Sequence, residues 1–123
     1  MILNEYQQQA MTTCMDSSKN PLYMLFMLGE EVGELQGKFS KAIRKGWISF
    51  DANQIKVHFD KCELDECKEW LDLVKKELGD CLWGIAGVAE VFCWSLEDVA
   101  QMNLDKLASR NQRGVIDGNG DNR

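Results

Sequence analysis

The sequence predicts an all-α protein with a single domain. The chain has 123 residues with one proline, and its apolar residues recur mainly at intervals of three and four. A chain of this length suits one compact core, and this spacing places apolar side chains on one face of a helix. We therefore expect a four-helix-bundle-like domain over residues 1–123, without an internal repeat.

Four segments have the periodicity and the end signals of helices. A capping-box pattern at Asn4 and Gln7 predicts the start of the first helix. Asn20 followed by Pro21 predicts the start of the second, and Gly46 is placed as a residue that ends it. We expect helices over residues 4–14, 21–45, 64–92 and 95–113.

Two segments fall outside this periodicity. Residues 47–62 have mixed apolar spacing, and we interpret them as a loop with a short helical turn. Residues 114–123 are rich in Gly and Asn, which favour turns and irregular chain. We expect this C-terminal tail to be extended or mobile.

The charge balance and the apolar runs argue against two classes of partner. Twenty acids stand against 14 bases, a net charge of −6, whereas nucleic-acid binding needs a surplus of Lys and Arg. No apolar stretch approaches the roughly 20 residues of a membrane span, and no N-terminal segment resembles a signal peptide. We therefore expect a cytoplasmic protein with no nucleic-acid or membrane partner.

The cysteines do not form a metal-binding pattern. There are five, none in C-x-x-C spacing, and His58 is the only histidine. A zinc site needs closely spaced pairs of such ligands. We expect reduced and mostly buried thiols, as in other intracellular proteins.

Two of the expected helices each carry a pair of acids one turn apart. The pairs are Glu31 with Glu34 and Glu77 with Asp80. Residues three apart lie on the same side of a helix, so each pair aims two carboxylates in one direction. If the helices face each other, four oxygen donors meet, a ligand set that suits Mg²⁺ or Mn²⁺. A solvated helix surface is the alternative, although both pairs border apolar stripes and have glycine beside them.

Several polar residues and one tryptophan have the chemistry to bind a nucleotide. The fourth helix has a face made of Asn103, Lys106, Arg110 and Arg113. These cations either complement the helix dipole or hold phosphate. A second basic set begins at Lys38, near the end of the second helix. Trp47 follows that helix in an irregular segment, where it either stacks on a base or belongs to the core.

The acid motifs resemble those of the MazG-type nucleotide pyrophosphohydrolases. The matching residues are Gly-Glu-Glu-Val-Gly-Glu-Leu at 29–35 and Lys-Lys-Glu-Leu-Gly-Asp at 75–80. The family pattern is Glu-Glu-x-x-Glu followed later by Glu-x-x-Asp. Residues 103–107, 110–114 and 118–123 also resemble the ending of a MazG-like subgroup common in bacteria and phages. Residues 47–66 look like an insertion between the two motifs.

The resemblance implies an all-α NTP pyrophosphatase fold and Mg²⁺-dependent hydrolysis of an NTP or dNTP to a monophosphate and pyrophosphate. It implies that Glu30 orients or deprotonates the attacking water, and that the metal ligands are Glu31, Glu34, Glu77 and Asp80. Asn103 and Lys106 would hold the nucleotide, with Arg110 or Arg113 on phosphate. Members form homodimers or homotetramers. A non-catalytic helical interaction module and a nucleotide-binding regulator are the alternatives.

Overall fold

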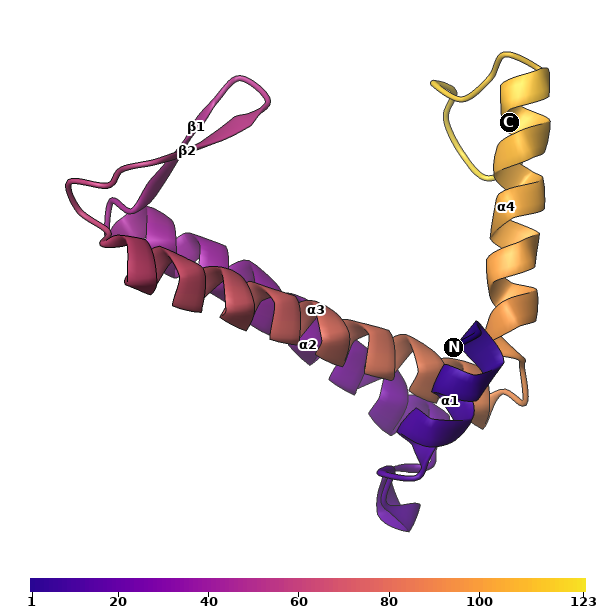
Figure 1. Ribbon diagram of the computed structural model, residues 1–123. Coiled ribbons are helices and arrows are strands. Elements are labelled where there is room, and N and C mark those ends of the chain that lie inside the picture. Colours follow the sequence, from indigo (N-terminus) through magenta and orange to yellow (C-terminus); the bar gives the residue numbers. More distant parts are fainter.

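Two long antiparallel helices, α2 and α3, form the body of the molecule (Figure 1). The computed structural model describes all 123 residues. The mostly helical character is confirmed, and the four expected helices are present with ends close to those expected. In chain order the elements are α1 (Leu3–Met11), the short 3₁₀ helix η1 (Asp16–Ser18), α2 (Pro21–Arg44), β1 (Ile48–Asp51), β2 (Gln54–Val57), α3 (Leu64–Val91) and α4 (Leu96–Gln112). No helix combines the length and the apolar character that crossing a bilayer requires.

The ends of α2 follow the local sequence. Asn20 Oδ1 accepts the backbone N–H of Tyr23 at 2.8 Å, and Pro21 is the first helical residue. Its missing N–H costs nothing there, because the first N–H groups of a helix have no partner within the helix. At the other end Gly46 has a φ of +71°, the left-handed conformation in which a side chain is strained. The chain therefore leaves α2 at the expected place.

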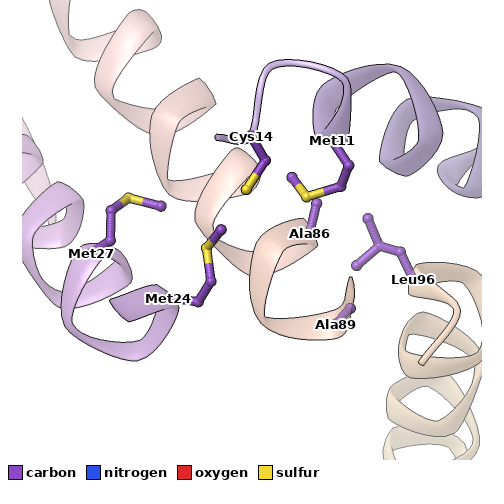
Figure 2. Close-up of a cluster of buried hydrophobic side chains, with 7 residues drawn as sticks. All are labelled: Met11, Cys14, Met24, Met27, Ala86, Ala89 and Leu96. Carbon is purple, nitrogen blue, oxygen red and sulfur yellow. The ribbon is translucent and has the colours of Figure 1, made fainter. Parts of the chain in front are cut away.

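Glycines on α3 let α2 approach closely. A Cβ atom on Gly84 would lie 3.3 Å from the Cα of Leu28, and one on Gly87 would lie 2.5 Å from the Sδ of Met24. Met24 is fully buried in the main core, which lies where α1 and α4 join the long helices (Figure 2). The buried members of this core are Met11, Cys14, Met24, Met27, Ala86, Ala89 and Leu96.

The side chains of Asn4 and Gln7 hold the start of α4, which corrects the capping box predicted from them. Asn4 Oδ1 accepts the N–H of Glu97 at 3.1 Å, and Gln7 Oε1 accepts the N–H of Leu96 at 2.7 Å. The amide of Gln7 also donates to the backbone oxygen of Trp94 at 3.0 Å. The first turn of α1 is held instead by Glu5, which accepts the N–H of Ile2. Free N–H groups at another helix start compete for the same side chains, and local sequence does not reveal that competitor.

Within one chain, α4 does not complete a four-helix bundle, contrary to the expectation from sequence. It begins beside α1 and then projects away from the α2–α3 pair (Figure 1). Its expected apolar stripe is therefore open, with Leu104 59% and Leu107 42% exposed. The accessible surface of the chain is 9031 Å², against about 6,700 Å² for a compact monomer of 14.0 kDa. Much of the apolar surface thus lacks a cover within the chain.

A β-hairpin replaces the loop with a helical turn that the sequence predicted for residues 47–62. Strands β1 and β2 pair antiparallel, with Ile48 opposite Val57 and Asp51 opposite Gln54. Apolar residues alternate with polar ones along both strands, which is the sequence signal for a strand pair. The signal is weak because the strands are short and Phe50 remains 58% exposed. Only Ile48 is buried, and it packs with Trp70 at the end of the helical pair.

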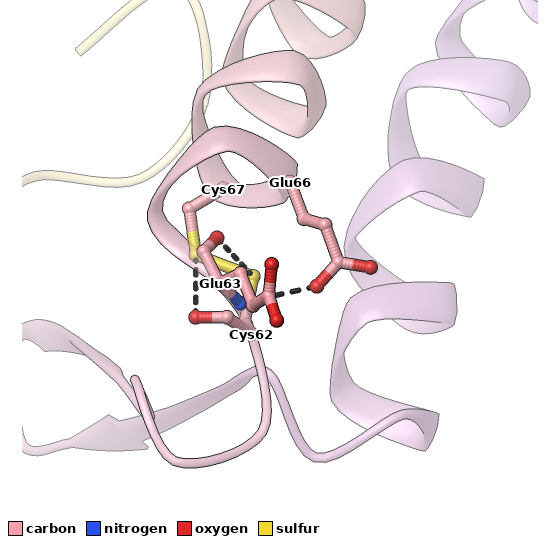
Figure 3. The surroundings of a disulfide bond; sticks show 4 residues. All are labelled: Cys62, Glu63, Glu66 and Cys67. Carbon is pink, nitrogen blue, oxygen red and sulfur yellow. Dashed lines mark hydrogen bonds between the residues drawn. A yellow bond between two sulfur atoms is a disulfide. The ribbon is translucent and has the colours of Figure 1, made fainter.

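Two cysteines at the start of α3 are bonded to each other. A disulfide joins Cys62 and Cys67, whose Cα atoms are 6.1 Å apart, which corrects the expectation of reduced thiols for these two (Figure 3). They flank a capping interaction in which Glu66 accepts the backbone N–H of Glu63 at 3.0 Å. Residues before the cap and in the first turn commonly pack together as a hydrophobic staple, and the two cysteines have those positions. Cys14, Cys81 and Cys93 are free thiols.

Candidate metal centre

Three glutamates from the two long helices meet near the middle of the pair. Glu31 and Glu34 lie one turn apart on α2, and Glu77 faces them from α3. One carboxylate oxygen from each lies within 4.8 Å of the others. The close packing of α2 on α3 makes this meeting possible. We call Glu31, Glu34 and Glu77 the acid cluster.

Two further acids border the acid cluster. Asp80 lies one turn beyond Glu77 and is not among the three that meet within 4.8 Å. The pKa of Glu31 is raised above its ordinary value, first by burial and then by the charge of Asp80. The charges of Glu34 and Glu30 raise this pKa further. Glu30 is exposed beside Glu31, on the side of α2 open to solvent.

The chemistry of the acid cluster fits a hard divalent cation. All its donors are carboxylate oxygens, with no imidazole or free thiol among them. Such ligands suit Mg²⁺ or Mn²⁺ and do not favour softer metals. Glu77 is only 8% exposed, so its charge is costly without a partner. Like charges this close also resist joint ionisation, and a divalent cation removes that conflict.

One lysine is paired with the acid cluster. Lys38 Nζ lies 2.9 Å from Glu77 Oε1, across the gap between α2 and α3. The hydrogen bond to Glu77, with the nearby negative charge of Glu34 adding to it, raises the pKa of Lys38. The backbone oxygen of Lys38 accepts the indole N–H of Trp70 at 3.0 Å. The backbone of Lys38 is thus held while its side chain reaches towards the carboxylates.

A groove continues from the acid cluster towards the hairpin. Its volume is about 480 Å³, and Glu34, Lys38, Lys41, Lys45 and Trp47 lie along it. The Lys45 ammonium lies 4.3 Å from the centre of the Trp47 ring. Trp70, from α3, also lines this groove. Cations and aromatic rings next to hard oxygen donors have the chemistry to contact phosphate and to stack on a base.

The predicted ligands on α4 lie apart from the acid cluster of the same chain, since α4 projects away from α2 and α3 (Figure 1). Asn103 and Lys106 line a second pocket of about 630 Å³ together with Trp94. Trp94 is 54% exposed and stacks on Phe92 with ring centres 4.8 Å apart. Within one chain, Asn103 and Lys106 therefore line a different pocket from the one that Glu34 of the acid cluster lines.

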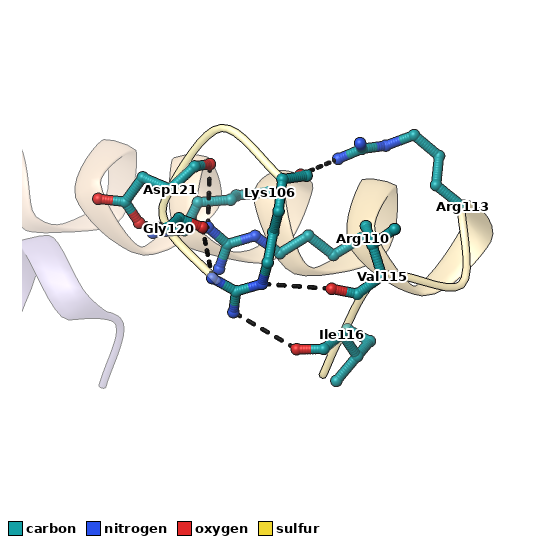
Figure 4. A network of polar contacts seen from close by, with 8 residues as sticks. Lys106, Arg110, Arg113, Val115, Ile116, Gly120 and Asp121 are labelled. Atoms are coloured by element: carbon teal, nitrogen blue, oxygen red, sulfur yellow. Dashed lines mark hydrogen bonds and ion pairs between the residues drawn. The ribbon is translucent and has the colours of Figure 1, made fainter. Parts of the chain in front are cut away.

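The C-terminal tail, residues 114–123, which the sequence predicted to be extended or mobile, folds back along α4 (Figure 4). Arg110, only 5% exposed, donates to the backbone oxygens of Gly120 at 3.3 Å and Asp121 at 3.0 Å. Arg113 donates to the backbone oxygen of Arg123 at 2.6 Å, and the Arg123 guanidinium donates to Gly120. The two arginines predicted to contact phosphate therefore hold the tail within this chain.

Sequence reasoning did not single out Tyr6 or Trp70. The pKa of Tyr6, on α1, is raised by burial and then by the charge of Asp80 on α3. Trp70 packs edge-on against Phe39, with ring centres 5.2 Å apart. Neither belongs to a motif, and the contacts that place them join distant parts of the chain. For Trp70 alone the sequence held an indication of a role at the site, because Trp70 lies on the same face of the helix as Glu77.

Comparisons with known proteins bear on what this site does. The sequence profile of the MazG nucleotide pyrophosphohydrolase domain matches residues 19–115, which include both acid motifs. The chain belongs to this family. The resemblance to the MazG family that the motifs indicated is therefore confirmed. Members of this family typically use a divalent metal.

One curated relative supports the assignment to the MazG family. The Gene 37 protein of Mycobacterium phage L5 is 35% identical over 109 residues, covering 88% of this chain and 81% of that protein. Its name states no activity. No solved structure shows a significant match. The MazG assignment therefore rests on sequence, and the geometry described above is independent of it.

Proposed function

We propose that this MazG protein is a Mg²⁺-dependent nucleoside triphosphate pyrophosphohydrolase. It cleaves an NTP or dNTP between the α and β phosphates and releases a monophosphate and pyrophosphate. The observation that carries the proposal is the meeting of Glu31, Glu34 and Glu77 within 4.8 Å, in a chain whose family is nucleotide pyrophosphohydrolases. Hard oxygen ligands beside a cationic groove suit a metal-bound polyphosphate.

The acids have two roles in this proposal. Glu31, Glu34, Glu77 and Asp80 hold the metal. When bound, Mg²⁺ withdraws charge from phosphate oxygens and lowers the pKa of a coordinated water. Glu30 orients the attacking water or accepts its proton, and its exposed place beside Glu31 supports this role.

The nucleotide is bound by residues from two regions. Lys38 contacts phosphate and Trp47 stacks on the base, which is supported by their common groove beside the acid cluster. Asn103 and Lys106 of α4 contact the nucleotide at the site of a neighbouring copy, with Arg110 or Arg113 on phosphate. Support for a neighbour comes from the separation of α4 from the acid cluster within one chain.

The protein forms a homodimer or homotetramer in this proposal, and the uncovered surface supports it. The accessible area exceeds that of a compact monomer of this mass by about a third. Exposed apolar side chains on both long helices, among them Leu25, Leu78 and Ile85, are what a second copy would cover. Light scattering coupled to gel filtration measures the mass directly. A monomer at micromolar concentration would contradict the assembly.

The decisive experiment is a screen of all common NTPs and dNTPs with Mg²⁺ or Mn²⁺, following pyrophosphate and monophosphate release. We expect turnover of at least one nucleotide, with a loss of roughly a hundredfold or more in Glu34→Gln and Asp80→Asn. Asp72→Asn is the matched control, because Asp72 is an exposed acid of α3 outside the acid cluster. Full activity in both site variants would refute the metal assignment. Binding without release would favour the regulator.

A further inference from the structure

Lys38 is the one cation that forms an ion pair with the acid cluster. Its Nζ lies 2.9 Å from Glu77 Oε1, and no other basic group comes within 4.0 Å of a carboxylate in the cluster. Glu77 is also the most buried of the three glutamates. Without a metal, Lys38 is therefore the counter-ion that makes burial of this carboxylate tolerable.

A divalent cation at the acid cluster would compete with the Lys38 ammonium for the carboxylate of Glu77. The oxygens that would hold the metal lie within 4.8 Å of one another, and the Lys38 ammonium is 2.9 Å from the same Glu77 carboxylate. Like charges a few ångströms apart in a partly desolvated site repel strongly. A metal at the acid cluster would thus weaken the ion pair between Lys38 and Glu77.

The groove offers the Lys38 ammonium another destination. Lys38 lines it together with Lys41 and Lys45, neither of which has a carboxylate within 4.0 Å. The backbone of Lys38 is held by the Trp70 indole, whereas its side chain has a flexible four-carbon stem. A turn of that stem moves the charge from the acid cluster into the groove, where a polyphosphate bound to the metal would extend.

We propose that Lys38 exchanges partners: it neutralises Glu77 in the metal-free protein and pairs with a substrate phosphate once the metal takes Glu77. This inference rests on the proposed function, because it needs a metal at the acid cluster. It gives Lys38 opposite effects on two affinities. Lys38 opposes metal binding when no nucleotide is present, and it favours nucleotide binding when the metal is in place.

The test measures both affinities in the full chain. Mn²⁺ binding without nucleotide is followed by electron paramagnetic resonance in the wild type, Lys38→Met, Lys38→Arg and Lys76→Met. Lys76 is the matched control, since it adjoins Glu77 in sequence but is exposed and forms no ion pair. We expect Lys38→Met to bind Mn²⁺ roughly three- to tenfold more tightly, with little change in Lys76→Met. Lys38→Arg keeps the charge and should behave like the wild type.

The second arm measures calorimetric binding of dNTP analogues with a non-hydrolysable α,β-imido bridge at saturating Mn²⁺. We expect Lys38→Met to bind them roughly tenfold more weakly, because a phosphate contact is lost. Mn²⁺ affinity that is unchanged or weaker in Lys38→Met, while Glu77→Gln still abolishes binding, would overturn the exchange and leave the proposed function intact. Absence of Mn²⁺ binding in the wild type would overturn both.

Discussion

The guanidinium of Arg110 lies 3.2 Å from the Oδ1 of Asp121, so a buried cation of α4 is paired with the C-terminal tail. Lys106 approaches the same carboxylate at 3.6 Å. The Asp121 carboxylate thus occupies the position from which a phosphate would contact both Lys106 and Arg110. Binding of phosphate by Arg110 stays a prediction, and it requires the tail to move or a different face of the guanidinium to be used.

Docking of the tail should depend on pH through Asp121. The hydrogen bond from Arg110, with the charges of Lys106 and Arg110, lowers the pKa of Asp121 below its ordinary 3.8. The docked tail therefore binds a proton more weakly than the free tail. The stabilisation of docking by the ionised Asp121 is complete above pH 3.8. It is lost as the pH falls through the lowered pKa that Asp121 has in the docked tail. Amide NMR shifts of Gly118 and Gly120 should move towards those of Asp121→Asn on acidification. Asp117→Asn, with no ion pair, should titrate like the wild type.

Gln7 should be essential for the junction of α1 and α4. Replacement by Leu leaves the N–H of Leu96 and the backbone oxygen of Trp94 without their partner in a buried place. We expect a loss of roughly 1–3 kcal/mol in the free energy of unfolding. Gln9→Leu is the control, because Gln9 is exposed on the same helix. Urea denaturation measures both, and equal stability of the two variants would contradict the role of Gln7.

Two glycines of α3 should respond to alanine with opposite signs. Gly87→Ala forces Met24 to move, and we expect a loss of roughly 1–3 kcal/mol. Gly79 has open space where a Cβ would point, so alanine there should stabilise the helix by up to about 1 kcal/mol. Thermal melts without metal compare them. Greater damage from Gly79→Ala would instead indicate that another chain packs against this position.

Metal should stabilise the folded protein through the acid cluster. A cation that binds only the native state at a hundred times its Kd adds about 2.7 kcal/mol. We expect millimolar Mn²⁺ or Mg²⁺ to raise the melting temperature of the wild type but not of Glu77→Gln. Calorimetry with Asp72→Asn, which should respond like the wild type, controls for nonspecific charge. An indifferent wild type would favour the non-catalytic module.

Glu30 should separate catalysis from metal binding. If it serves the attacking water, Glu30→Gln lowers kcat by roughly 10²- to 10⁴-fold while the affinity for Mn²⁺ stays near that of the wild type. Glu34→Gln should lose both, since Glu34 belongs to the acid cluster. Steady-state kinetics with Mn²⁺ titration by electron paramagnetic resonance gives the two quantities. A large loss of Mn²⁺ affinity in Glu30→Gln would make Glu30 a ligand.

The part of the candidate site that depends on spacing within one helix was predictable from the sequence. Glu31 and Glu34 share a face because they are three residues apart, and this holds in any helix. That Glu77 meets them depends on the approach of α3 to α2, which the sequence indicated only through the glycines. The ion pair between Lys38 and Glu77 was not predictable. Several acids lie nearer to Lys38 along the sequence than Glu77 does, and the packing of α2 on α3 selects Glu77.

Local sequence alone determined the helices, the ends of α2 at Asn20 and Gly46, and the common face of Glu31 and Glu34, because these depend on neighbours within a few residues. Only the tertiary structure decided that Gln7 accepts the N–H of Leu96, that the tail folds onto Arg110 and that Glu77 meets Glu31 and Glu34. Each of those outcomes is a competition between a local partner and a distant one for the same hydrogen bonds or the same buried space. The total free energy of the folded chain decides such competitions, and the sequence of a short segment is not enough to predict the outcome.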